Sequence, residues 1–351
     1  MDHPSGVTAR VSARTQMRKN EHALDELRAC VQPAGNVLVA THDFPDPDCL
    51  ASALGLQHLL RSWGTPKVTI AYGGFIGRLE NQAMVRLAGI EATTINRVLN
   101  DGFERVVLVD AYPGSGNVSL PEDFGFDVVI DHHHHPHRRR RCFEDIRTDI
   151  AATSSIIAGY IRQADCELTP DIATALFYGI KTDTNHMRHP VSTYDRETYQ
   201  WLFPQIDLAM LANIEDPPRT TDYFRTVHDA IENMNIRGDF GYAHLPNVGA
   251  PDLIAEMTDF VARHDRLHWT VCSGICDETL YFSVRSKFER RAGTLAGRLA
   301  RSLKGSGGGH ALRGAGQIPL HGRDRAEVQR RFVQSLHHAL RIQADGAESI
   351  F

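Results

Sequence analysis

The sequence of 351 residues contains no run of about 18 apolar residues, although 42% of its residues are hydrophobic. A helix that crosses a bilayer needs about 20 such residues in succession, so we expect neither a membrane span nor a membrane partner. Arg10, Arg14, Arg18 and Lys19 near the N-terminus are followed by no apolar core. The segment therefore does not resemble a secretory signal, and we expect a cytoplasmic protein.

Cysteine is scarce and scattered. The chain lacks the close cysteine pairs that are typical of metal-ligand spacing, and its six cysteines are Cys30, Cys49, Cys142, Cys166, Cys272 and Cys276. This pattern predicts reduced thiols in a cytoplasmic setting.

An excess of positive charge is also missing, because 38 Lys and Arg stand against 43 Asp and Glu and give a net charge of −5. A domain that follows long nucleic acid is usually basic, so we expect no long duplex as partner. A small nucleotide or a short single-stranded RNA in a local positive pocket is compatible with this charge. The sequence leaves open whether the chain forms a homodimer.

The length predicts about two domains. Residues 36–110 alternate β-branched runs with helical segments, an order typical of an α/β fold whose parallel sheet has helices on both faces. Two antiparallel strands near 268–286 lie among helices, which predicts a smaller α/β domain with a mixed sheet. We predict an N-terminal extension with a helix over 1–34, a catalytic domain over 35–206, a linker over 207–221 and a second domain over 222–345.

Acids and histidines follow the predicted strands of the first domain. The runs 36–41, 106–109 and 128–130 each end on such a residue, and a further acid follows the helical run 172–180. Ligands of open α/β sheets bind at the carboxyl ends of the strands, so we expect these side chains to lie together. They are His42, Asp46, Asp48, Asp110, Asp131, His132, His133 and Asp183.

This set mixes carboxylates with imidazoles and contains no thiolate. Such donors suit Mn²⁺ better than a structural zinc, with Mg²⁺ or Co²⁺ as alternatives. Two ions about 3.5–4 Å apart, bridged by one carboxylate and one water, make a hydrolytic phosphoester site. Taken singly, His42 would more often be a packed or surface histidine, and Asp46 and Asp48 beside prolines would be turn residues.

The spacing His42-x-x-x-Asp46-x-Asp48, followed by Asp110 and by Asp131-His132-His133, resembles the DHH phosphoesterases. Asp183 within Gly-Ile-Lys-Thr-Asp-Thr extends the match. The later stretch Gly307-Gly308-Gly309-His310 is similar to the glycine-rich motif of the DHH-associated C-terminal domain. The resemblance covers roughly residues 35 to 320, and the combined motifs are highly specific.

The resemblance implies a role for each residue. One Mn²⁺ ion is bound by His42, Asp46 and Asp110. A second ion is bound by Asp48, His132 and Asp183, with Asp110 as the bridge. His133 points at the phosphate as a hydrogen-bond donor or an acid. Asp131 orients an imidazole without contacting a metal ion itself. A water activated by both metal ions is then the nucleophile.

The second domain is implied to handle the substrate. The residues concerned are Arg285, Gly308, Gly309, His310 and Arg313. Glycine lets backbone N–H groups approach a phosphate, although a glycine run alone is also typical of a flexible loop, and Arg285 of a surface cation. Arg313 is either an extra cation near the phosphate or a sign of a register change, because the chain departs here from the usual motif.

Three functions follow from the resemblance. The first is hydrolysis of short oligoribonucleotides, of pAp (3′-phosphoadenosine 5′-phosphate) or of linear dinucleotides, as in the bifunctional oligoribonuclease and pAp phosphatase (NrnA-like) group. A pyrophosphatase or exopolyphosphatase on the same metal core is the second. A nucleotide-sensing module with an inactive site is the third.

Two segments near the predicted site have alternative interpretations. Residues 152–155 open a predicted helix, and their small polar side chains either cap it or help its N-terminus to bind an anion. The run 134–141 is rich in histidine and arginine. It is either a solvated charged loop or a phosphate-binding one.

Overall fold

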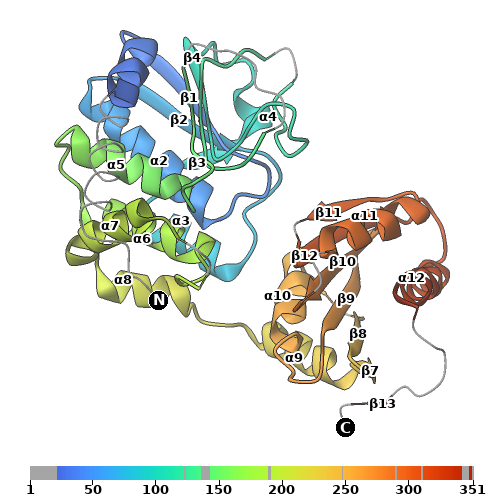
Figure 1. The fold of residues 1–351 in the computed structure, drawn as a ribbon. Coiled ribbons are helices and arrows are strands. Elements are labelled where there is room, and N and C mark those ends of the chain that lie inside the picture. Colours follow the sequence, from blue (N-terminus) through green and yellow to red (C-terminus); the bar gives the residue numbers. More distant parts are fainter. Residues whose placement is uncertain are drawn as a thin grey trace. The chain divides into compact units, whose positions relative to one another are not determined.

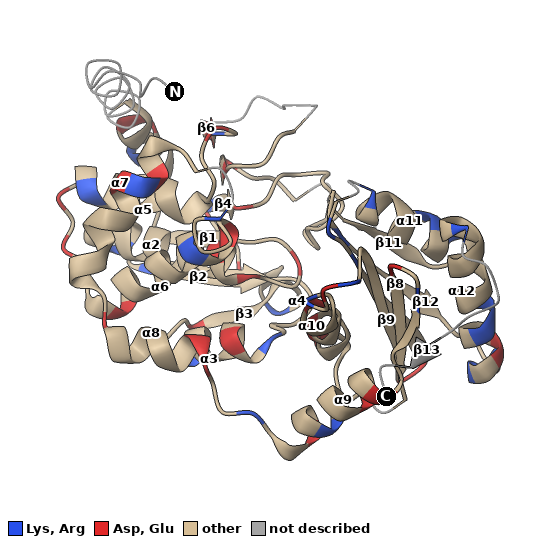
Figure 2. Ribbon diagram, turned by 60° about the horizontal axis from the view of Figure 1, so that its bottom comes forward, with Lys and Arg blue, Asp and Glu red and all other residues tan. Residues whose placement is uncertain are grey.

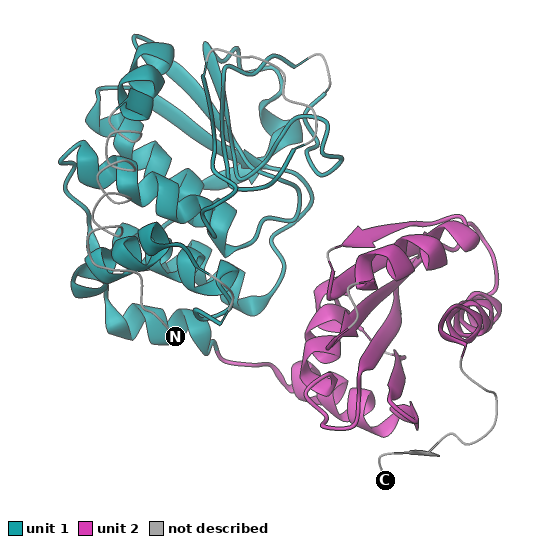
Figure 3. Cartoon of the chain, in the orientation of Figure 1, with its two compact units in different colours: residues 1–217 teal, residues 218–351 magenta. Residues whose placement is uncertain are grey.

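The chain forms two compact units, Met1–Pro217 and Pro218–Phe351 (Figure 3). Each unit has its own sheet and its own hydrophobic core. The fold is given by a computed structural model, which describes residues 22–121, 124–135, 143–188, 191–246, 248–288, 291–309, 311–341 and 348–349.

The sheet of unit 1 has six parallel strands in the order β3-β2-β1-β4-β5-β6 (Figure 1). The order reverses between β1 and β4, because β2 and β3 extend the sheet on one side and β5 and β6 on the other. The strands are β1 (Asn36–Ala40), β2 (Lys67–Tyr72), β3 (Ala92–Thr94), β4 (Arg105–Val109), β5 (Val128–Asp131) and β6 (Phe143–Ile146).

Alternate residues of these strands enter two separate cores. Val37 and Val39 of β1 belong to the larger core, together with the helices of the unit, whereas Leu38 and Ala40 belong to a second core with the short helix α4 (Ile95–Val98). The larger core is covered by a helix over 22–31 and by α2 (Pro47–Ser62), α3 (Leu79–Leu87), α5 (Thr153–Gln163), α6 (Pro170–Asp183), α7 (Thr193–Leu202), the short helix η1 (Phe203–Gln205) and α8 (Leu208–Glu215).

Helix α2 is buried around most of its circumference because it packs against both α5 and α6. It begins at an N-cap, Asp46, whose carboxylate accepts a hydrogen bond from the N–H of Cys49 at 3.1 Å. Pro47 occupies the first helical position, where a missing N–H costs nothing. The sequence therefore starts this helix at the point where the aspartates stand.

The sheet of unit 2 is mixed, as predicted: β8 pairs with β9 in parallel and the other neighbours are antiparallel. Its order is β11-β12-β10-β9-β8-β7-β13. The strands are β7 (Asn235–Arg237), β8 (Phe240–Leu245), β9 (Trp269–Cys276), β10 (Thr279–Ser286), β11 (Ser306–Gly309), β12 (Arg313–Pro319) and β13 (Glu348–Ser349).

Four helices accompany this sheet and share two cores with it. Helices α9 (Thr221–Glu232) and α10 (Pro251–Val261) belong to one core. Helices α11 (Ala292–Ser302) and α12 (Arg325–Leu340) belong to the other.

The glycine-rich stretch expected as a loop is instead the edge strand β11, paired with β12. The glycines let α11 approach the strand closely. A Cβ atom on Gly293 of α11 would lie 2.1 Å from the carbonyl oxygen of Gly309, and Gly309 has a φ of +136°. Glycine is required here by backbone packing, which outweighs its low preference for strands.

The segment predicted as a linker, 207–221, contains helix α8, and the division between the units falls at Pro217. The N-cap Asp207 explains the helix, because its carboxylate accepts hydrogen bonds from the N–H groups of Ala209 and Met210 at 2.8 and 3.0 Å. Pro217 and Pro218 follow the helix closely and prevent its continuation.

The cysteines are not uniform, as Cys49, Cys166, Cys272 and Cys276 carry free thiols. Cys30 is disulfide-bonded, so the expectation of thiols throughout is wrong at this position. Among the described helices, none has the length and apolarity needed to cross a bilayer.

Candidate metal centre

The predicted ligands of unit 1 come together at the carboxyl ends of its central strands. His42 and Asp110 follow β1 and β4, the two neighbours between which the strand order reverses. Asp131 is the last residue of β5, so His132 and His133 leave the sheet beside them. Helix α2 brings Asp46 and Asp48 at its start, and α6 brings Asp183 at its end.

The side chains face one another at distances that a metal ion could bridge. His42 Nε2 lies 3.7 Å from both Asp46 Oδ1 and Asp110 Oδ2. His132 Nε2 lies 3.5 Å from Asp110 Oδ1 and 3.2 Å from Asp183 Oδ2. Asp110 thus presents one carboxylate oxygen to each histidine.

The donor atoms form overlapping groups whose members lie within 4.8 Å of one another, and a group of Asp110, Asp131, His132 and His133 connects the two that follow. One contains His42, Asp46 and Asp110, and the other contains Asp48, His132 and Asp183. The thiol of Cys49 belongs to the first group. We had not included Cys49 among the ligands, because its position one residue after Asp48 carries no recognisable motif.

Asp110 is held in an unusual conformation. Its φ is +54°, a left-handed value that few residues with a side chain adopt. Its N–H donates to the carbonyl oxygen of Ile130 at 2.9 Å, and Oδ1 accepts from the Thr153 hydroxyl at 2.8 Å. The two bonds fix the carboxylate that faces both histidines, and strain of this kind is typical of functional sites.

Asp48 occupies the N-terminus of α5. Its carboxylate oxygens accept from the N–H groups of Thr153 and Ser154 at 2.7 and 2.8 Å. Of the two interpretations of residues 152–155, the anion-binding one describes the geometry, but the anion is a side chain of the protein itself. Thr153 and Ser154 therefore position the cluster, a role that sequence reasoning did not assign.

Asp131 is fully buried and accepts four hydrogen bonds. The N–H groups of His132 and His133 reach Oδ1 at 2.7 and 3.1 Å, and His133 Nδ1 reaches it at 2.9 Å. His135 Nε2 lies 2.7 Å from Oδ2, and the ring of His135 stacks on Tyr112 with centroids 4.2 Å apart. The sequence places His135 only in the charged run 134–141, and no sequence signal distinguishes it from its neighbours.

Burial and mutual repulsion perturb the acids. Burial, with the nearby Asp48 carboxylate, raises the pKa of Asp183 to about 10. Burial also raises the pKa of Asp48 to about 7, with Asp110 as the next cause, and the pKa of Asp110 to about 6, with Asp46 as the next cause. The centre therefore holds more carboxylates than it can keep ionised together.

In the pair formed by Asp131 and His133, the pKa values shift in favour of the ionised forms. The hydrogen bond to Asp131 raises the pKa of His133 to about 9. Burial opposes ionisation of Asp131, yet the hydrogen bonds from His133 and His135 bring its pKa down to about 2. His133 is therefore a cation at neutral pH, paired with a carboxylate that stays ionised.

The residues fit divalent metal ions. Oxygen and imidazole donors dominate the cluster, which favours Mn²⁺ or a similar ion over purely thiolate-binding metals. Bound cations would also remove the repulsion that raises the pKa values of Asp48, Asp110 and Asp183. The chemistry of the donor set and its electrostatics agree on this point.

The residues expected to bind substrate lie in unit 2. Arg285 on β10 is engaged within the unit, because Nε and Nη2 contact the carboxylate of Asp259 at 2.5 and 3.1 Å and Nη1 contacts the Ser283 hydroxyl at 2.8 Å. Gly308 and Gly309 belong to β11. Arg313 begins β12 and is the register partner of Arg285 on the neighbouring strand β10. His310 lies outside the described residues, as do residues 136–142 of the charged run.

Residues 36–180 match the model of the DHH family, N-terminal domain. This part of the chain is therefore a DHH domain, which confirms the resemblance inferred from the motif. Members of the DHH family are metal-dependent phosphoesterases.

Two relatives extend the match into unit 2. An uncharacterized protein of Methanocaldococcus jannaschii is 32% identical over 286 residues, which are 81% of this chain and 58% of that protein. The chain thus spans less than two thirds of this relative. The bifunctional oligoribonuclease and PAP phosphatase NrnA of Thermus thermophilus is 28% identical over 316 residues, with 87% of this chain and 90% of NrnA covered.

Solved structures confirm the α/β fold. An exopolyphosphatase-related protein from Bacteroides fragilis aligns with a TM-score of 0.73 at 17% identity and covers 91% of this chain and 96% of its own. RecJ of Thermus thermophilus, solved in complex with Mn²⁺, aligns with a TM-score of 0.54 at 13% identity, over 93% of this chain and 55% of RecJ. At these identities the likeness concerns the fold alone.

Proposed function

We propose that the chain hydrolyses phosphoester bonds in small nucleotides, with Mn²⁺ as its metal. The observation that carries the proposal is the buried cluster at the switch point of the sheet, where Asp110 faces both His42 and His132. A cluster of carboxylates and imidazoles in this position is suited to a pair of ions on a phosphate group.

In this proposal His42, Asp46 and Asp110 hold one ion, and Asp48, Asp110, His132 and Asp183 hold the other. When bound, the ions would polarise a phosphoryl oxygen and lower the pKa of the attacking water. Thr153 orients Asp110 through its hydroxyl, and the N–H groups of Thr153 and Ser154 orient Asp48. These bonds fix the positions of the carboxylates before a ligand arrives.

His133 is the proposed donor to the substrate. Its side chain is 44% exposed while its Nδ1 is bound to Asp131. Because both ring nitrogens are protonated below a pKa of about 9, Nε2 can donate a hydrogen bond or a proton to a phosphate oxygen or to the leaving group. Asp131 keeps the His133 imidazole oriented and charged, and His135 contacts the second oxygen of the Asp131 carboxylate.

We further propose that unit 2 binds the part of the substrate that does not react. Arg285, Gly308, Gly309, His310 and Arg313 are the residues assigned to this role. Arg285 and Arg313 are paired in register on β10 and β12. Their guanidinium groups would favour a second phosphate.

Nucleotides are the favoured substrates because NrnA, named as an oligoribonuclease and PAP phosphatase, is similar over most of both chains. The net charge of −5 also argues against long nucleic acid. We therefore assign short oligoribonucleotides, pAp or linear dinucleotides as the substrate class.

The proposal is tested with metal-free protein that is reloaded with Mn²⁺, Mg²⁺ or Co²⁺. Hydrolysis is measured on pAp, pApA, a trinucleotide RNA, a long duplex, pyrophosphate and polyphosphate. We expect turnover of one or more of the first three substrates, with the highest rate in Mn²⁺. Faster hydrolysis of pyrophosphate or polyphosphate than of every nucleotide would contradict the proposed substrate class.

A further inference from the structure

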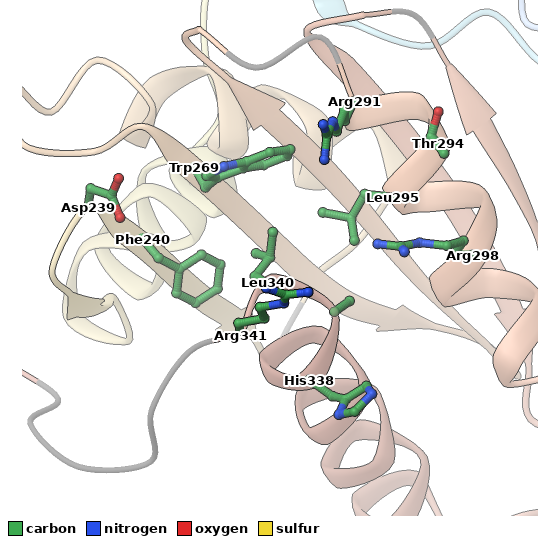
Figure 4. A pocket seen from close by; sticks show the side chains of 11 residues that line it. Asp239, Phe240, Trp269, Arg291, Thr294, Leu295, Arg298, His338, Leu340 and Arg341 are labelled. Carbon is green, nitrogen blue, oxygen red and sulfur yellow. The ribbon is translucent and has the colours of Figure 1, made fainter.

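Unit 2 contains a cavity of about 950 Å³ that the proposed phosphoesterase activity does not use (Figure 4). It lies over the starts of β8 and β9, where Phe240 and Trp269 form one wall, and beside α11 and the end of α12. Its volume is at the upper end of the range for small-molecule sites. The cavity is therefore large enough for a nucleotide.

Three arginines surround this cavity. Arg291, directly before α11, and Arg298 within it extend toward the cavity, and Arg341 stands at the end of α12 (Figure 4). In the part of the chain that the structure describes, none of the three has an ion pair or a side-chain hydrogen bond to another residue. Positions occupied by Lys or Arg, which are blue on the ribbon in Figure 2, recur along α11 and α12.

The acidic residue at the cavity does not balance this charge. Asp239 lines the cavity, but its Oδ2 lies 3.0 Å from Nδ1 of His268. Elsewhere in the chain, guanidinium groups in partly closed sites have a carboxylate partner, as Arg285 has Asp259 and Arg147 has Asp145. Among the described residues, the three cavity arginines therefore have no carboxylate within ion-pair distance. Guanidinium groups bind phosphate through paired N–H donors.

Part of the remaining wall is apolar, although Thr294 and His338 also line the cavity. Phe240, Trp269 and Leu340 border the space between the arginines and the sheet (Figure 4). The indole N–H of Trp269 has no acceptor among the described residues. An inorganic anion would bind the arginines but would make no contact with the apolar wall and would not accept a hydrogen bond from the Trp269 indole. A phosphate ester that carries a heterocyclic base would match both.

We infer that this cavity binds a nucleoside monophosphate, with the arginines on the phosphate and the apolar wall against the base. The site shares no residue with the metal centre, since all its residues belong to unit 2 and none is a proposed metal ligand or a proposed substrate residue. It needs no divalent ion, because the protein itself supplies the positive charge.

The test is calorimetric titration of the full chain with AMP in the presence of EDTA, so that the metal centre does not contribute. Arg298→Ala and Arg291→Ala should each weaken AMP binding about tenfold, the loss expected for one charge-assisted contact. Arg301→Ala is the matched control, because Arg301 is exposed on the same helix but does not line the cavity. It should leave the affinity unchanged, as should Asp110→Asn in the metal centre.

A spectroscopic readout locates the ligand. The chain has three tryptophans, and Trp269 is the one in unit 2. AMP should shift the indole N–H resonance of Trp269 and leave those of Trp63 and Trp201 in place. Trp269→Phe identifies the resonance.

Four outcomes would overturn the inference. They are no binding of AMP in EDTA, equal affinity for inorganic phosphate, equal affinity for adenosine, and equal losses in Arg298→Ala and Arg301→Ala. The first and last would remove the site, and the other two would remove the base or the phosphate from its ligand. None bears on hydrolysis in Mn²⁺, so failure here is distinguishable from failure of the proposed activity.

Discussion

The two units differ in the sign of the charge that gathers at their sites. In unit 1 the acids Asp48, Asp110 and Asp131 are buried and held by hydrogen bonds, Asp48 by Thr153 and Ser154. In unit 2 the arginines of the cavity are exposed and, among the described residues, unpaired. A centre of fixed, crowded carboxylates is prepared for cations, whereas a cavity with unmatched guanidinium groups is prepared for an anion. Each unit lacks the charge that its ligand would supply.

The largest effect is expected from Asp110, which we propose as a ligand of both ions. Asp110→Asn keeps the size of the side chain but removes a charge from each proposed ligand set, so two-ion loading should fail. Replacing a residue that hydrogen-bonds a metal ligand already lowers metal affinity or activity by about 10–100-fold. For the ligand itself, we expect turnover in Mn²⁺ to fall by more than about a hundredfold. Metal content by mass spectrometry and the rate on pAp check this. A variant with normal loading and rate would exclude Asp110 as a shared ligand.

The sequence predicted that the acids and histidines of unit 1 would lie together, and the reason is physical. In a parallel sheet, β-branched runs such as Val128–Ile130 must be buried, so an acid at the end of the run marks the edge of the sheet. What the sequence could not predict are the contacts made by residues with ambiguous chemistry. His135 and Thr153 act through tertiary contacts, which leave no periodic pattern.

Unit 2 was harder to predict for a different reason. Glycine has no preference for strands, so β11 was expected as a loop. It forms a strand by pairing with β12, and α11 approaches it so closely that a side chain at Gly293 would collide with Gly309. The cavity arginines are spread over residues 291–341 and share no motif, so only the fold brings them together.

The second prediction concerns the cost of the crowded acids. The pKa of Asp183 is about 10 in the folded chain against a usual 3.8, so the folded state retains a proton that the unfolded state releases. Such a group destabilises the metal-free protein increasingly as pH rises above 3.8 toward 10. Asp183→Asn should therefore raise the melting temperature in EDTA by roughly 3 °C or more, and by more at pH 8 than at pH 5.

The control for this prediction is the same pair of proteins in Mn²⁺. The wild type should gain stability from the ion, and Asp183→Asn should gain less, because it has lost a ligand. A variant that melts below the wild type in EDTA at pH 8 would show that the carboxylate is not under repulsion.

The third prediction tests packing in unit 2. Gly293→Ala places a Cβ atom 2.1 Å from the Gly309 carbonyl oxygen and should lower the free energy of unfolding by about 1–3 kcal/mol. Gly308→Ala is the matched control, since nothing lies within 4 Å of its Cβ position. Denaturant unfolding of both variants checks this, and equal losses would contradict the close contact of α11 with β11.

The fourth prediction returns to the metal centre. Thr153→Val removes the hydroxyl that contacts Asp110 Oδ1 at 2.8 Å but keeps the backbone N–H that contacts Asp48. Affinity for Mn²⁺, measured by calorimetry, should fall about tenfold. Thr153→Ser should restore it, because serine has the same hydroxyl. If serine and valine behave alike, the bond to Asp110 does not orient the ligand.

The smallest effect is expected at Arg285, where binding must be separated from structure. Arg285→Ala should lower kcat/KM on pApA about tenfold, leave metal content unchanged and hardly affect an aryl phosphodiester, which has no second phosphate or base. Because Arg285 is bound to Asp259, its loss should also destabilise unit 2. Asp259→Asn supplies the control, since it weakens the same ion pair but leaves the guanidinium in place. If both variants lose stability but only Arg285→Ala loses activity on pApA, the arginine binds substrate. Equal activity in the two variants would mean that Arg285 stabilises the fold of unit 2 and does not bind substrate. The cavity lined by Arg291, Arg298 and Arg341 would then be the stronger candidate for nucleotide binding in this unit.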